Sequence, residues 1–140
     1  MTMTRCNNWP EKLDLFIEEK RRQAFDWRSN NCAFFAADWL AILVGVDLAE
    51  KFRGKVTSPR SALEVIQAGG EVDAIAAQEL ERIGATEVAV ALARRGDIVT
   101  TETRHGPAMG VWLGHCAAFA GPEGVQFIRA EEIRRAWRVA

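Results

Sequence analysis

The spacing of apolar residues changes once along the chain, near Gly84, and this change constrains the fold more than any other feature. Before Gly84, apolar residues recur at the i, i+3, i+4 and i+7 positions of an α-helix, most clearly from Cys32 to Val44. After Gly84, short apolar runs alternate with turn residues, as β-strands do. This order predicts an α+β fold in which N-terminal helices pack on a C-terminal antiparallel β-sheet.

The chain has 140 residues, enough for one domain with a substantial core, and we expect a single domain over residues 1–140. It divides into a helical part at 10–84, a sheet part at 88–130 and a C-terminal tail at 131–140. The predicted helices cover residues 10–24, 32–44, 58–69 and 71–83, with helical turns at 47–52 and 131–136. The predicted strands cover residues 88–91, 96–101, 108–113, 116–120 and 125–128. The 32–44 helix is the most apolar, so we expect it to pack on the sheet.

Charge and composition exclude several classes of function. The 18 basic and 19 acidic residues give a net charge of −1, so we expect no nucleic-acid partner. No stretch reaches the roughly 20 apolar residues of a membrane helix, and the N-terminus lacks the apolar run of a signal peptide. Three irregularly spaced cysteines do not form a disulfide framework, which predicts synthesis in a reducing cytoplasm.

Cys32 is the candidate for chemistry. It follows Asn30 and Asn31, which can cap a helix, and it opens the apolar 32–44 helix. The unpaired N–H groups and positive dipole end of a helix N-terminus stabilise a thiolate, which is how a nucleophilic cysteine is made. The alternative is that Cys32 is a small buried hydrophobe, as free cysteines often are.

Three motifs occur in the order seen in a known family. Asn31-Cys32-Ala33 before an aromatic-rich helix resembles the nucleophile motif of the NlpC-type, papain-like cysteine peptidases. The runs Arg95–Val99 and Met109–Gly114 resemble two of that family's strands, "GD-[IV]-[IV]" and "HVGIYLG". The Ala136–Val139 ending is similar to the "AWRV"-type tail of small phage and prophage NlpC-like proteins. The resemblance implies a papain-like topology and a place among the tail-tip proteins of a phage.

The chain departs from this family at its catalytic histidine. The family's histidine falls on Ala108, and its third polar residue falls on Phe119 or Ala120, so only the nucleophile is retained. A thiolate needs a base within about 2.6–3.2 Å. His105, in the segment entering the 108–113 strand, is the better candidate, because His115 follows that strand at its opposite end.

Two hypotheses follow. The first is a catalytically degenerate tail-tip or baseplate protein, located in the virion tail, that binds other tail proteins through exposed apolar residues such as Trp9 and Trp137. The second is an active endopeptidase or amidase on peptidoglycan stem peptides, with Cys32 as nucleophile and His105 as base; an acyltransferase or thioesterase is a third use of such a fold.

We expect no cofactor and no metal, because the adjacent His115 and Cys116 would point to opposite faces of a strand and could not readily join Cys32 or Cys6 around zinc.

Overall fold

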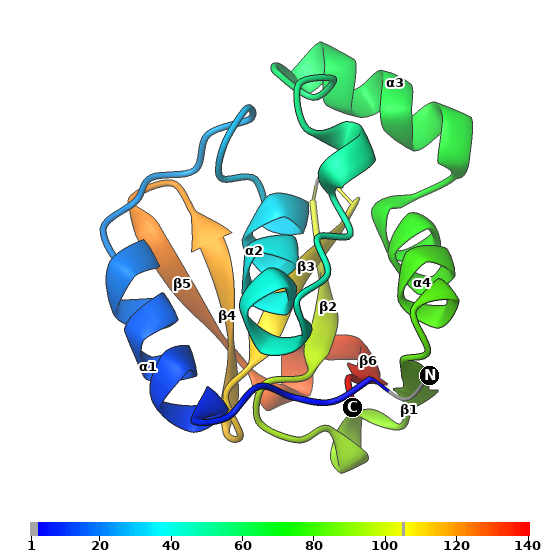
Figure 1. Ribbon diagram of the computed structural model, residues 1–140. Coiled ribbons are helices and arrows are strands. Elements are labelled where there is room, and N and C mark those ends of the chain that lie inside the picture. The colour runs from blue at the N-terminus through cyan, green and yellow to red at the C-terminus, as the bar shows by residue number, and fades with distance from the viewer. Residues whose placement is uncertain (1–2, 105) are drawn as a thin grey trace.

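The computed structural model describes residues 3–104 and 106–140, and in it a layer of helices lies on one face of a β-sheet (Figure 1). Four α-helices come first within these residues: α1 (Trp9–Lys20), α2 (Cys32–Val44), α3 (Pro59–Gly69) and α4 (Val72–Arg82). Short 3₁₀ turns lie at η1 (Glu50–Phe52), η2 (Val90–Leu92) and η3 (Ala130–Glu132). None of these helices is long and apolar enough to cross a membrane.

Local signals in the sequence set the helix ends. The bounds of α2 are those predicted, and Gly45 ends it in a left-handed conformation (φ 77°) that only glycine adopts readily. Ser58 and Ser61 form a capping box that starts α3. By contrast, α1 ends at Lys20 rather than near residue 24, because the chain then turns so that the N–H of Phe25 reaches Gly121 O, 2.9 Å away.

The sheet has six strands within the described residues, all antiparallel, in the order β1-β6-β2-β3-β4-β5. The strands are β1 (Thr86–Val88), β2 (Ile98–Thr103), β3 (Gly106–Trp112), β4 (Cys116–Gly121), β5 (Gly124–Arg129) and β6 (Ile133–Arg138). β2 to β5 form the predicted meander, and the α+β class is confirmed. The strand predicted at 88–91 ends at Val88 and is followed by η2.

The prediction for the C-terminal tail was wrong. Residues 131–136 were expected to form a helical turn, but Ile133–Arg138 is a strand that lies between β1 and β2. Its pairing with β2 contains a bulge, because Thr100 faces Arg135 whereas Thr101 faces Ile133. The extra residue, Arg134, interrupts the alternation that marks a strand, so the sequence pattern was hidden.

The helices cover one face of the sheet, as Figure 1 shows. α2 packs on β3 and β4, which confirms its predicted role, while α4 packs on β3 and α1 packs on α2. α3 lies farther from the sheet and packs on α4. Ala62 is the buried residue of α3, whereas its neighbour Leu63 is 53% exposed.

Apolar clusters lie on both faces of the sheet. The larger one joins the helices to the sheet through residues such as Trp39, Leu40 and Val111. A smaller one on the strands includes Val99, Phe119 and Ala136. Trp137 belongs to the larger cluster and is fully buried, so the prediction that it lies at an interface was wrong. Trp9 is half-buried beneath the Arg5 guanidinium, 4.4 Å from its ring centre.

A buried carboxylate ties both ends of the described chain to β2. Asp97, fully buried, accepts hydrogen bonds from Arg5 Nη2 at 2.7 Å, the Arg94 N–H at 2.7 Å and the Val139 N–H at 3.1 Å. Arg5 also donates to the carbonyls of Arg95 (2.6 Å) and Val139 (2.9 Å). These contacts fix the N-terminal segment and the end of β6 beside the start of β2.

Candidate functional site: a thiol in an apolar cavity

The Asn31 side chain makes two hydrogen bonds at the start of α2. The Asn31 side chain accepts a hydrogen bond from the Phe34 N–H at 2.8 Å and donates one to Trp27 O at 2.9 Å. It therefore caps the helix, as predicted for Asn30 or Asn31, and anchors the preceding loop to it. Cys32 is the first residue of the helix that this cap defines.

Cys32 lies where two neighbouring strands separate. β3 and β4 pair only at Val111 with Ala118 and at Trp112 with Ala117. Met109 precedes Val111 by two residues, so its N–H points to the same edge of β3, where β4 no longer pairs with it. That N–H points toward the Cys32 sulfur instead and lowers the pKa of its thiol.

The environment of Cys32 favours the neutral thiol. Burial raises the pKa of the Cys32 thiol above its ordinary value, and the N–H groups of Met109, Ala33 and Cys32 itself offset this only in part. The residue keeps some exposure because one side faces a cavity, while protein surrounds its other sides. The helix N-terminus predicted from the sequence is present, but desolvation outweighs its effect on the thiol.

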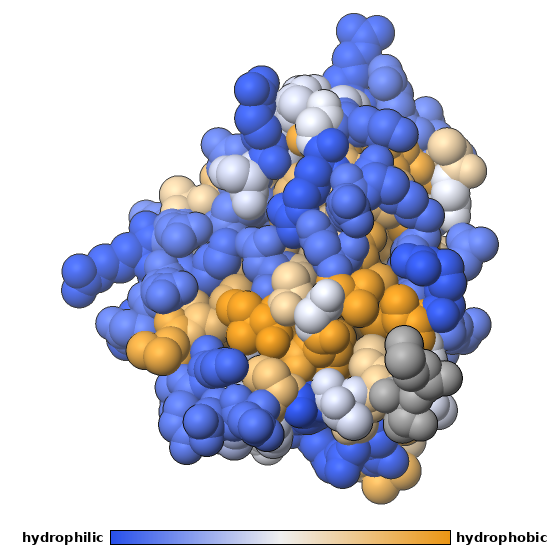
Figure 2. Space-filling view, in the orientation of Figure 1, coloured by the Kyte–Doolittle hydropathy of each residue, from blue (hydrophilic) through white to orange (hydrophobic). Residues whose placement is uncertain are grey.

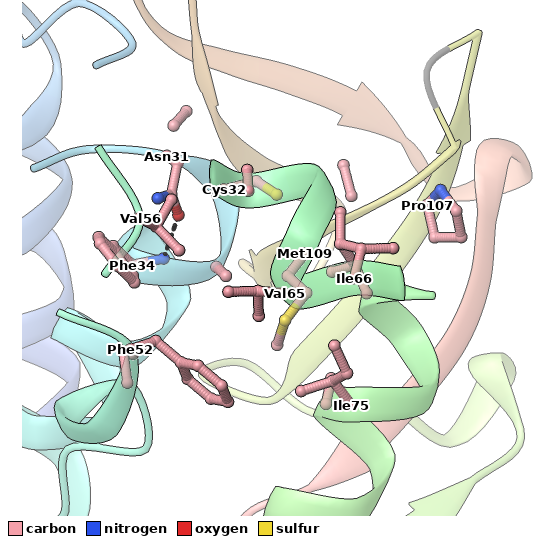
Figure 3. A pocket seen from close by; sticks show the side chains of 18 of the residues that line it. Asn31, Cys32, Phe34, Phe52, Val56, Val65, Ile66, Ile75, Pro107 and Met109 are labelled. Carbon is pink, nitrogen blue, oxygen red and sulfur yellow. Dashed lines mark hydrogen bonds between the residues drawn. The ribbon is translucent and has the colours of Figure 1, made fainter. Parts of the chain in front are cut away.

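The cavity has a volume of about 840 Å³ and lies between the start of α2, the helices α3 and α4, and β3. Figure 3 shows side chains from all four elements around it, among them Cys32, Met109 and Ile66. The lining is almost entirely apolar. Outside it, Figure 2 shows a band of hydrophobic residues across one face of the molecule, bordered by hydrophilic ones.

The structure brings only part of the predicted site together. Ala108, which the resemblance aligns with the histidine of the NlpC-type peptidases, lines the cavity with Cys32, and so does Ala120. His115 lies exposed between β3 and β4, at the far end of β3. The predicted base, His105, lies outside the described residues. No histidine of the described part of the chain lines the cavity.

Phe119, the other position for the family's third polar residue, belongs to the smaller apolar cluster. Its ring also covers the backbone of Gly110, since a Cβ built there would lie 2.7 Å from that ring. This position therefore supplies packing instead of a polar group.

The described residues provide no candidate metal centre. Across residues 3–104 and 106–140, no three His, Cys, Asp or Glu side chains gather as metal ligands would. Cys6, Cys32 and Cys116 are free thiols. Burial also raises the pKa of the Cys116 thiol.

Two features of the site were not predicted from the sequence. The cavity depends on how α3 and α4 are placed beside the start of α2 and β3, and no residue pattern indicates that placement. The role of Asp97 was partly visible, because it belongs to the "GD-[IV]-[IV]" resemblance, but its burial with Arg5 and Val139 was not.

Fold and site together define an α+β protein whose helices and antiparallel sheet enclose an apolar, cysteine-lined cavity. The family model described as "Domain of unknown function (DUF6950)" matches residues 4–139, and the chain belongs to this family. No curated protein matches the chain.

Proposed function

We propose that this protein has a papain-like, NlpC-type fold that has lost cysteine-peptidase chemistry and now acts by binding, as a structural component of a phage tail tip. One observation carries the loss of catalysis. The Cys32 thiol lies in an apolar cavity that raises its pKa, and Ala108 lines that cavity where the related peptidases have a histidine.

The other ionisable group on the cavity wall does not replace a base. Glu79 lines the cavity, but its carboxylate is paired with Lys51 and accepts a hydrogen bond from Arg82 Nε at 3.1 Å. These hydrogen bonds outweigh burial and lower the pKa of Glu79, so its carboxylate is a weak base at neutral pH. The tail-tip assignment rests on the sequence resemblance, including the Ala136–Val139 ending.

One observation favours the alternative, an active peptidase or amidase acting on peptidoglycan peptides. The N–H groups of Ala33 and Met109 point at the Cys32 sulfur, and such donors also stabilise a thiolate nucleophile. This alternative requires His105 as the base.

Alkylation of Cys32 by iodoacetamide, measured for each cysteine peptide by mass spectrometry, distinguishes the inactive binding protein from the active peptidase. Because burial raises its pKa, Cys32 should react more slowly at pH 7 than a free thiol such as N-acetylcysteine, and faster as the pH rises above about 8.5. Fast labelling at pH 6–7 that disappears in His105→Ala would instead establish the active enzyme.

A gain-of-function variant tests the papain-like assignment. If Ala108 occupies the histidine position, Ala108→His should place an imidazole beside Cys32 and increase its labelling at pH 6–7 at least tenfold. Ala89→His, at an exposed position after β1, is the matched control and should change nothing. An Ala108→His protein that folds but labels like the wild type would contradict the papain-like placement.

The tail-tip role has its own test, the protein content of purified phage particles. Mass spectrometry should find this chain in intact virions of the phage that encodes it, at a copy number similar to other tail-tip proteins. Its absence from particles that contain the other tail-tip proteins would overturn the structural role.

A further inference from the structure

The cavity next to Cys32 has the size and lining of a binding site. Its volume of about 840 Å³ lies within the roughly 300–1,000 Å³ range of small-molecule sites. α3 forms one wall, where Val65 and Ile66 line the cavity (Figure 3), and Val65 also packs against the apolar cluster that contains Ala62. Apolar side chains that line such a space gain contacts when an apolar ligand fills it.

Polar side chains on the wall already have partners inside the protein. Asn31 caps α2 and holds Trp27 O, and Glu79 is paired with Lys51. The Thr103 hydroxyl donates to Gly106 O at 2.7 Å. These groups are committed to the protein's own structure and do not select a polar ligand.

The edge of β3 beside the cavity also has no free backbone N–H at Met109 and Pro107, the two positions that face the cavity. The Met109 N–H points toward the Cys32 sulfur, and Pro107, two residues earlier on the same edge, has no N–H. An extended peptide bound here would not find the alternating donors and acceptors of a strand. Burying its backbone without partners is costly, which disfavours a peptide in the interior of the cavity.

We propose that the cavity binds the unbranched hydrocarbon chain of a single-chain amphiphile, such as a free fatty acid, with its head group in water at the mouth near Trp27. Trp27 lines the cavity and is 38% exposed, so it borders both the chain and the solvent. This inference rests on the proposed function, because it names what a cavity without peptidase chemistry holds.

Titration with trans-parinaric acid, an unbranched fluorescent fatty acid, tests the proposal. The wild-type protein should bind one molecule per chain, saturably and with micromolar affinity. Val65→Trp, which fills the cavity, and Ile66→Glu, which puts a charge on its wall, should each weaken binding at least tenfold. Leu15→Glu is the matched control, because Leu15 is 61% exposed on α1 and does not line the cavity. Absence of saturable binding, or equal binding by folded cavity variants, would overturn the proposal.

A homologous series of competitors gives a sharper signature. Each methylene added from C8 toward C16 should tighten binding roughly fourfold until the cavity is full. Palmitate and hexadecanol should compete within a few-fold of each other, because the polar side chains described on the wall, those of Asn31, Glu79 and Thr103, already have partners within the protein. Displacement of the probe by apolar peptides but not by palmitate would show that the site takes a protein segment instead.

Cys32 provides a readout that requires no variant. Saturating palmitate should slow alkylation of Cys32 at least fivefold while leaving Cys116, which does not line the cavity, unchanged. The two proposals then fail separately. Rapid alkylation of Cys32 in the ligand-free protein would refute the loss of catalysis but not the binding of a hydrocarbon chain. Slow alkylation without any fatty-acid binding would refute only the proposed hydrocarbon site.

Discussion

The buried carboxylate of Asp97 should be among the most sensitive single positions in the protein. It accepts three hydrogen bonds, one from the Arg5 guanidinium and two from backbone N–H groups, and its side chain has no exposure. Removing one member of a buried ion pair costs about 3–5 kcal/mol, because the remaining charge and donors stay buried without a partner. We therefore expect Asp97→Ala to lower the free energy of unfolding by about 3–5 kcal/mol. Asp97→Asn, which keeps the shape but turns an NH₂ group toward a donor, should lower it by about 2–3 kcal/mol.

Urea unfolding followed by tryptophan fluorescence measures this, since Trp39 and Trp137 are fully buried. Arg5→Ala and the Arg5→Ala/Asp97→Ala double variant complete a double-mutant cycle. We expect a coupling energy between Arg5 and Asp97 of about 1–3 kcal/mol, and the rest of the loss in Asp97→Ala then belongs to the two backbone donors. Asp14→Ala is the control: its carboxylate pairs with Arg95 at 2.6 Å but is 74% exposed, so it should cost less than about 1 kcal/mol. A loss below about 1 kcal/mol in Asp97→Ala, with an unchanged urea dependence, would refute the reasoning.

Three further predictions concern single contacts. Gly110→Ala should destabilise the protein by about 1–3 kcal/mol in urea unfolding, because the new Cβ would lie 2.5 Å from Ala118 O; a wild-type midpoint would contradict the packing described for β3 and β4. Asn31→Ala should cost about 0.5–2 kcal/mol through loss of the cap on the Phe34 N–H, and Asn31→Ser should restore part of it. Glu79 has a folded-state pKa below its ordinary value, so its contribution is present above the unfolded pKa of about 4.3 and is lost as the pH falls through the folded value. Glu79→Gln should therefore flatten the fall in thermal stability between about pH 5 and pH 3, and an unchanged slope would argue against the pairing.

Where the sequence carries a strong local signal, it predicted the fold well. The helix from Cys32 to Val44 begins after an asparagine cap and ends at a left-handed glycine, and both ends were predicted correctly. Turn residues likewise located the ends of the strands β2 to β5 to within two residues. β6 was missed because Glu131 to Ala136 has good helix formers, and the bulge at Arg134 conceals the alternation of the strand.

The candidate site was less predictable, because it depends on how deeply Cys32 is buried and on which apolar side chains line a cavity. A capped helix start correctly located Cys32, but the sequence could not show that burial would outweigh the helix N-terminus in setting its pKa. The cavity lies between the start of α2, the helices α3 and α4, and β3, and Val65 and Ile66 of α3 line it. Helical periodicity identifies an apolar face but does not say whether that face meets protein or a void.

The position of β6 has a consequence for how the protein folds as it is synthesised. β6 lies between β1 and β2, so the sheet is completed by a strand that leaves the ribosome after β1 to β5. The helices and the β2–β5 meander can form earlier, but β1 has no neighbour, and the place of Trp137 in the core stays empty, until residue 138 has emerged. Until β6 has been synthesised, the nascent chain carries an open strand edge on β2 and an incomplete core, features that favour aggregation and binding by chaperones.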